Sequence, residues 1–100
     1  MNDYQIISWI FYAIARASHK SPCSIKEFSM IADGINHSIP SPREIKDLTK
    51  WLLKNDMIAI HLKKYSLTKK GHIIYGFAHL SADNILNTWK NLELQMKKIS

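Results

Sequence analysis

The chain of 100 residues has room for one domain, and 46% hydrophobic with 22% charged residues is the composition of a globular protein rather than a disordered one. Three glycines and three prolines exclude collagen-like or low-complexity architecture, and one cysteine, Cys23, excludes an internal disulfide. The formal net charge of +6 suggests a polyanionic partner or a solubility device, and carries no information about the fold.

The sequence gives no sign of a membrane segment. The most apolar run, Ile6 to Ala15, would rise ~15 Å as a helix, about half the thickness of a bilayer core. The start, Met1-Asn2-Asp3, lacks the cationic stretch that opens a signal peptide, and the lone thiol fits a reducing compartment. We therefore expect a cytoplasmic protein without a membrane partner.

A first helix is predicted from Asn2, a good capping residue, to about Ser18. It has two apolar faces, which consist of Ile7, Ile10, Phe11 and Ile14 on one side and Ile6, Trp9 and Ala13 on the other. A short helix with two apolar faces either lies at the centre of its domain or contacts a partner.

Two capping boxes predict the next two helices. The box Ser24–Glu27 predicts a helix from Ile25 to about Ile35. The box Ser41–Glu44 predicts a helix from Pro42 to about Lys54, with proline at the first helical position, where its missing N–H does no harm.

A β-hairpin and two further helices are predicted in the second half. Residues 57–62 and 65–67 are rich in β-forming side chains, which predicts two strands with Lys63 and Lys64 at the tip. Thr68 can cap a helix over residues 69–80, whose core candidates are Ile73, Ile74 and Phe77. Ser81 can cap a last helix over residues 82–98.

Three helices followed by a hairpin are the order of elements in a winged helix-turn-helix domain. The predicted fold class is therefore mainly α with a small β-hairpin, a winged helix-turn-helix with an added C-terminal helix. Residues 1–80 would form the winged-helix domain, and residues 81–100 the C-terminal helix, a candidate dimerisation element.

The excess charge is concentrated around the predicted third helix, since residues 41–80 hold +5 of the net +6. On a helical wheel its four cations share one stripe beside the apolar face. A helix that enters the DNA major groove needs an apolar back and a basic front, and its first residues meet the base edges. The predicted DNA contacts are Ser41, Arg43, Lys46, Lys50 and Lys54 on this helix and Lys63 and Lys64 in the hairpin, which Lys69 and Lys70 would extend.

A second interpretation stays open. Exposed helix faces of basic proteins often carry lysines for solvation alone. Here Glu44 and Asp47 flank the basic stripe, and the wing is short and has no glycine at its tip. The alternative function is a winged-helix module for protein–protein interaction that does not bind DNA.

Part of the sequence resembles a family of regulators. The pattern Ile45-x-x-Leu48-x-x-x-Leu52, then Asn55-Asp56-Met57-Ile58, then Tyr65-Ser66-Leu67-Thr68-Lys69-Lys70-Gly71, is similar to the end of the winged-helix domain in MarR-like and PadR-like bacterial regulators. The similarity covers about residues 24–75, and residues 32–40 also resemble a segment of small bacterial winged-helix proteins. The chain departs from the regulators at Asp56, where glycine is usual, and in the longer spacing between its second and third helices. The resemblance implies a homodimer that reads a pseudo-palindromic operator in double-stranded DNA.

The last predicted helix has a heptad seam, with members spaced 4, 3, 4 and 3 apart: Ile85, Trp89, Leu92, Met96 and Ile99. Such a seam packs against a second copy or against its own domain, for example on the first helix, and in many small dimers it does both. The second apolar face of the first helix favours the dimer slightly.

No arrangement of residues suggests catalysis, a cofactor or a metal. His72 and His79 share a helix face but stand ~10 Å apart, which is too far for one ion. No histidine or cysteine pair has the spacing of a metal-binding motif, and Cys23 has no activating partner in the sequence. We expect a protein that is not an enzyme.

Overall fold

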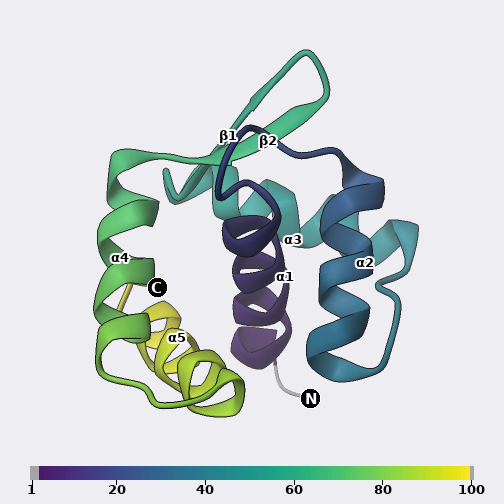
Figure 1. The fold of residues 1–100 in the computed structure, drawn as a ribbon. Coiled ribbons are helices and arrows are strands. Elements are labelled where there is room, and N and C mark those ends of the chain that lie inside the picture. Colours follow the sequence, from purple (N-terminus) through teal and green to yellow (C-terminus); the bar gives the residue numbers. More distant parts are fainter. Residues whose placement is uncertain (1–2, 100) are drawn as a thin grey trace.

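A computed structural model describes residues 3–99 (Figure 1). Within this range the chain is mainly helical and has one small antiparallel sheet. Its elements are α1 (Asp3–Ala17), α2 (Ile25–Asn36), α3 (Pro42–Lys54), β1 (Ile58–His61), β2 (Lys64–Leu67), α4 (Lys69–Leu80) and α5 (Ile85–Ile99).

The first helix occupies the centre of the molecule. Every residue of α1 from Ile7 to Ala15 is buried, because α2, α3, α4, α5 and β2 all contact it. Figure 1 shows α2 and α4 on opposite sides of α1. Both predicted apolar faces are therefore used within the chain, and the helix is central. The predicted cap Asn2 lies outside the described residues.

Both predicted capping boxes are present. At the start of α2, the Glu27 N–H donates to the Ser24 hydroxyl at 3.1 Å, and the Ser24 N–H donates to the Glu27 carboxylate at 2.9 Å. Ser41 and Glu44 make the same reciprocal pair at the start of α3, at the same two distances. The hydrogen bond from Ser24 holds the pKa of Glu27 below its ordinary value. These boxes supply partners for N–H groups that the first turn of a helix leaves unpaired.

The hairpin differs slightly from the prediction. The strands pair in the register Ile58 with Leu67 and His61 with Lys64, so Lys64 belongs to β2 and not to the tip. The two-residue turn consists of Leu62 and Lys63, at φ angles of 49° and 64°. A positive φ at both turn residues suits the right-handed twist of the strands, although glycine or asparagine adopts it more easily.

The chain also turns sharply between α3 and β1. Asp56 has a φ of 57°, a left-handed conformation that favours glycine and that aspartate tolerates better than most residues. The Asp56 carbonyl then accepts a hydrogen bond from the Thr68 hydroxyl at 2.6 Å, which ties the turn to the start of α4.

Thr68 caps α4 as predicted, since its hydroxyl accepts the Gly71 N–H at 3.0 Å. Gly71 itself lies against the hairpin: a Cβ at this position would stand 2.1 Å from the Met57 carbonyl oxygen. No side chain larger than hydrogen fits there without movement of the backbone. The first turn of α4 is therefore held directly against the start of the hairpin.

The predicted cap of the last helix is wrong. Ser81 follows the end of α4, where its hydroxyl donates to the Phe77 carbonyl at 2.9 Å. Asn84 has the capping role at the start of α5, because its side-chain oxygen accepts the Asn87 N–H at 2.8 Å. The helix therefore begins at Ile85 and not at Ala82.

Two of the three core candidates in α4 are also wrong. Ile73 is 51% exposed and Phe77 is 66% exposed, and only Ile74 packs against the core. The buried positions of this helix are the small residues Gly71 and Ala78. Small residues on the inner side let α4 approach its neighbours closely, while large apolar side chains remain on the outer side.

The heptad seam of α5 packs on the same chain. Trp89, Leu92 and Met96 are buried, Ile99 packs against the core, and Ile85 is 42% exposed. The Trp89 indole N–H donates to the Gln5 carbonyl of α1 at 2.9 Å. The seam therefore packs against α1 of its own chain. Within residues 3–99, no helix has both the length and the apolar character to cross a bilayer.

The turn at Leu62 and Lys63 leads to a prediction about stability. Replacement by Leu62→Asn and Lys63→Gly lowers the cost of the left-handed conformation at position 62 and removes its steric cause at position 63, and we expect a gain of about 1–2 kcal/mol in the free energy of unfolding. Urea denaturation followed by circular dichroism measures it. The control Leu62→Ala with Lys63→Ala keeps both Cβ atoms, so a gain as large in the control would contradict this explanation.

Candidate nucleic-acid interface

The predicted contact residues of α3 lie along its solvent side. Arg43, Lys46, Lys50 and Lys54 are all exposed, whereas Ile45, Thr49 and Leu52 on the inner side are buried. Ser41 is exposed too, but its hydroxyl accepts the Glu44 N–H in the capping box. The structure thus brings the four cations to one helix and presents them to solvent.

Carboxylates partly neutralise this surface. Arg43 lies 3.9 Å from Asp47, one turn further along α3, and Lys64 lies 3.8 Å from Glu27 of α2. Both pairs are exposed, so each contributes little to stability and leaves its cation accessible. Among the described residues, Lys46, Lys50, Lys54 and Lys63 form no ion pair. These four lysines carry the uncompensated positive charge of the predicted interface.

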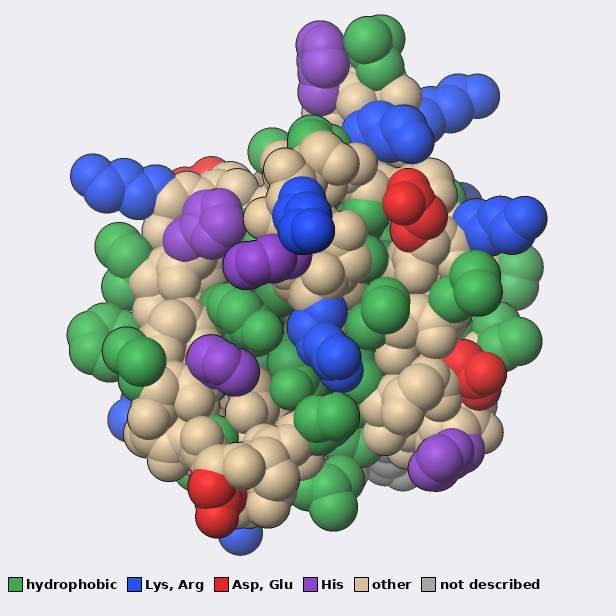
Figure 2. Space-filling view, viewed as in Figure 1, with side chains coloured by type: hydrophobic (Ala, Val, Ile, Leu, Met, Phe, Trp, Pro, Cys, Tyr) green, Lys and Arg blue, Asp and Glu red, His purple; other side chains and the backbone are tan. Residues whose placement is uncertain are grey.

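The hairpin projects from the rest of the molecule. Figure 2 shows lysine or arginine side chains beside its tip, at the top of the view. Lys63 is exposed at the turn, next to Leu62, which is 82% exposed. Lys70, which was predicted to extend the contact, donates to the Asn55 carbonyl at 2.9 Å and so helps to hold the turn before β1, while Lys69 stays exposed.

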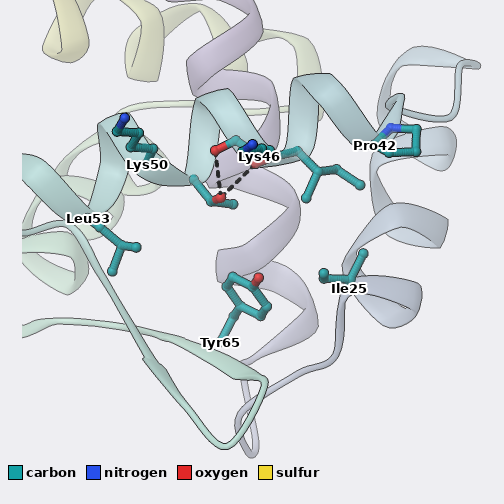
Figure 3. Close-up of a pocket in the computed structure, with 8 residues that line it drawn as sticks. Ile25, Pro42, Lys46, Lys50, Leu53 and Tyr65 are labelled. Atoms are coloured by element: carbon teal, nitrogen blue, oxygen red, sulfur yellow. Dashed lines mark hydrogen bonds between the residues drawn. The ribbon is translucent and has the colours of Figure 1, made fainter.

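A groove lies between α3 and the hairpin, and the sequence did not predict it. Its volume is about 480 Å³. Figure 3 shows the Tyr65 ring below α3, with Ile25 and Leu53 to either side. The lining comprises Ile25, Pro42, Ile45, Lys46, Thr49, Lys50, Leu53 and Tyr65. Thr49 offers the groove little polarity, because its hydroxyl donates to the Ile45 carbonyl at 2.6 Å.

The floor of the groove is fixed by contacts between the hairpin and the start of α2. The backbones of Cys23 and Tyr65 exchange two hydrogen bonds, of 2.8 and 2.7 Å. The Tyr65 ring also packs edge-on against Phe28, with 5.2 Å between the ring centres. Burial raises the pKa of the Tyr65 hydroxyl above its ordinary value, further from neutral pH. Apolar walls with two lysines at the edge suit a ligand or partner that is apolar and anionic.

The remaining reactive residues do not form a site. Cys23 is fully buried, and burial raises the pKa of its thiol to about 11, so the nucleophilic thiolate is scarce. Among residues 3–99, no three histidine, cysteine or acidic side chains come together as ligands for a metal ion. His79 stacks on Tyr75, with 5.6 Å between the ring centres.

Comparison with protein-family models, with curated proteins and with solved structures finds no significant match to this chain. The geometry of α3, the hairpin and the groove between them is therefore the basis for a functional proposal.

Burial of Cys23 leads to a second prediction. A rise in pKa from 9.0 to about 11 lowers the thiolate fraction at pH 8 by about 100-fold, and the lack of solvent exposure lowers access further. The native protein should therefore react with a thiol reagent such as DTNB at least 100-fold more slowly than the same chain in 8 M urea, after correction with a free thiol in each solvent. Comparable rates would show that the α2–hairpin junction opens readily.

Proposed function

We propose that this protein is a small dimeric winged helix-turn-helix DNA-binding protein that acts as a transcriptional regulator. The proposal rests chiefly on the exposed lysines of α3, Lys46, Lys50 and Lys54, which form no ion pair among the described residues. In support, the order of three helices and a hairpin is that of winged-helix proteins.

In this proposal, α3 enters the major groove by its N-terminal half. Ser41 and Arg43 stand at the start of the helix, where base edges are normally read, and an arginine can donate two hydrogen bonds to guanine. Lys46, Lys50 and Lys54 then neutralise phosphates along the groove, and Lys63 of the hairpin contacts the adjacent backbone. The two-residue turn at Leu62 and Lys63 limits how far the wing can reach into a minor groove.

A second candidate function has one observation in its favour. The groove of about 480 Å³ lies on the same face as the lysines, and its walls are mainly apolar. DNA offers few apolar groups to fill such a groove, whereas a protein segment with apolar and acidic side chains would fit it. The alternative is therefore a winged-helix module that binds another protein through this groove.

DNA binding is tested by its salt dependence. We expect the wild-type chain to bind a fluorescently labelled random duplex at low salt and to lose affinity steeply as salt increases, because phosphate contacts release counterions. In Lys46→Ala with Lys50→Ala, the slope of log K against log salt should become shallower by about 2, one for each lost phosphate contact. Fluorescence anisotropy across a salt series measures both.

The matched control is Lys90→Ala with Lys98→Ala, which removes the same charge from exposed positions of α5. Equal slopes for the two double variants would reject α3 as the interface. No detectable binding of the wild type at low salt would reject DNA binding altogether.

Leu53→Lys separates the two candidate functions. Leu53 is 41% exposed in the groove, so a lysine there adds a cation to the proposed interface and removes an apolar contact. If the face binds DNA, the slope of log K against log salt should become steeper by about 1. A variant that binds DNA no better than the wild type, with its fold retained by circular dichroism, would favour the groove as a protein-binding site.

A further inference from the structure

The outer face of α4 is apolar although it is exposed. With about 100° between successive residues, Ile73, Phe77 and Leu80 fall within an arc of about 60°, opposite the buried Gly71 and Ala78. The three large side chains are 51%, 66% and 86% exposed. We call Ile73, Phe77 and Leu80, together with Gly76 beside them, the outer α4 stripe. Figure 2 shows hydrophobic side chains along the left edge of the molecule, on the side that α4 occupies in Figure 1.

This arrangement is unusual for the surface helix of a monomer. Such a helix normally has its apolar residues toward the core and polar residues on the opposite face. The three side chains expose roughly 350 Å² in total, if a large apolar side chain has an area of somewhat under 200 Å². Monomers rarely expose apolar patches larger than a few hundred Å², and the largest patch on a monomer is often functional.

Gly76 is the second observation that points to a partner. It lies inside α4, where glycine destabilises a helix relative to alanine. Nothing in its own chain requires a glycine there, because its φ is not positive and a Cβ built at this position meets no atom within 4 Å. A residue without a side chain at the edge of an apolar stripe lets the backbone of a second helix approach closely.

We propose that the outer α4 stripe is the dimer interface, where α4 of a second copy packs antiparallel to the first with its centre near Gly76. Charge complementarity supports this occupant. Lys69 is the first residue of α4, seven residues before Gly76, and Asp83 lies three residues beyond the end of this helix; both are exposed. A twofold axis at the level of Gly76 therefore brings Lys69 of each copy toward the C-terminal end of the other copy's α4, where the helix dipole is negative and where Asp83 follows in the chain.

The proposal replaces the seam of α5 as the contact between copies. Trp89, Leu92 and Met96 are buried against the rest of their own chain, so they offer no free surface. The outer α4 stripe is formed by a different helix and shares no residue with the groove or with the lysines of α3. The inference therefore rests on the dimeric part of the proposed function but not on DNA binding, and it is tested without DNA.

Analytical ultracentrifugation of the full chain tests the interface. We expect a species of twice 11.6 kDa at protein concentrations of about 100 μM, in reversible equilibrium with the monomer. Phe77→Lys should weaken the dimer at least 10-fold, because it places a charge in the middle of the contact. Met30→Lys is the matched control, since Met30 on α2 is 68% exposed and Phe77 is 66% exposed. The control should dimerise like the wild type.

Two further variants test the antiparallel geometry. Lys69→Asp should weaken the dimer because each introduced carboxylate faces Asp83 of the other copy, and adding Asp83→Lys should restore much of the affinity. Gly76→Ala should raise the melting temperature of the dilute monomer and at the same time weaken dimerisation at least several-fold. A merely solvent-exposed glycine would give the first effect without the second.

A wild-type chain that sediments at 11.6 kDa up to about 300 μM overturns the proposal, and the stripe would then belong to a different protein or to a lipid surface. Equal effects of Phe77→Lys and Met30→Lys on a dimer that does form overturn it as well. Loss of DNA binding by the α3 variant with an intact dimer affects only the proposed function, so the two failures are distinguishable.

Discussion

The arrangement of the whole molecule depends on the burial of α1. Nine consecutive residues of this helix are buried, so it needs cover on every side rather than along one stripe. Two indole N–H groups hold neighbouring helices against α1. Trp9 of α1 donates to the Ala32 carbonyl of α2 at 2.8 Å, and Trp89 of α5 donates to the Gln5 carbonyl of α1 at 2.9 Å. With its inner side committed to this core, α3 has only its lysine side to present to solvent. The candidate interface is thus a consequence of how α1 is covered.

Features that depend on neighbouring residues could be predicted from the sequence. The capping boxes at Ser24 and Ser41 join residues three apart, so they set the starts of α2 and α3 whatever the rest of the chain does. The cap at Thr68 is equally local. The exposed cations of α3 followed from helical periodicity and from the apolar side that its core contacts require. The order of the helices, the hairpin and the charged part of the candidate site could be predicted from such local patterns.

Features that depend on distant residues could not be predicted. Ser81 and Asn84 are both good caps, and only the course of the chain after α4 selects Asn84. The heptad of α5 has the same spacing whether it meets α1 or a second copy. Ile73 and Phe77 look like core residues until the small Gly71 and Ala78 are seen to occupy the inner side of α4. The groove likewise could not be predicted, because its lining includes Ile25 of α2 and Tyr65 of the hairpin, which are far apart in the sequence.

The hydrogen bond between Trp89 and Gln5 joins residues that are 84 positions apart in the sequence. This separation affects the order in which the protein can fold during synthesis. A chain is synthesised from its N-terminus, so α1 emerges before α5, which covers part of it. Contacts of such long range also form slowly, because a large loop must close before they are made. Until α5 has been made, α1 therefore lacks part of its cover and exposes apolar surface that the folded protein buries.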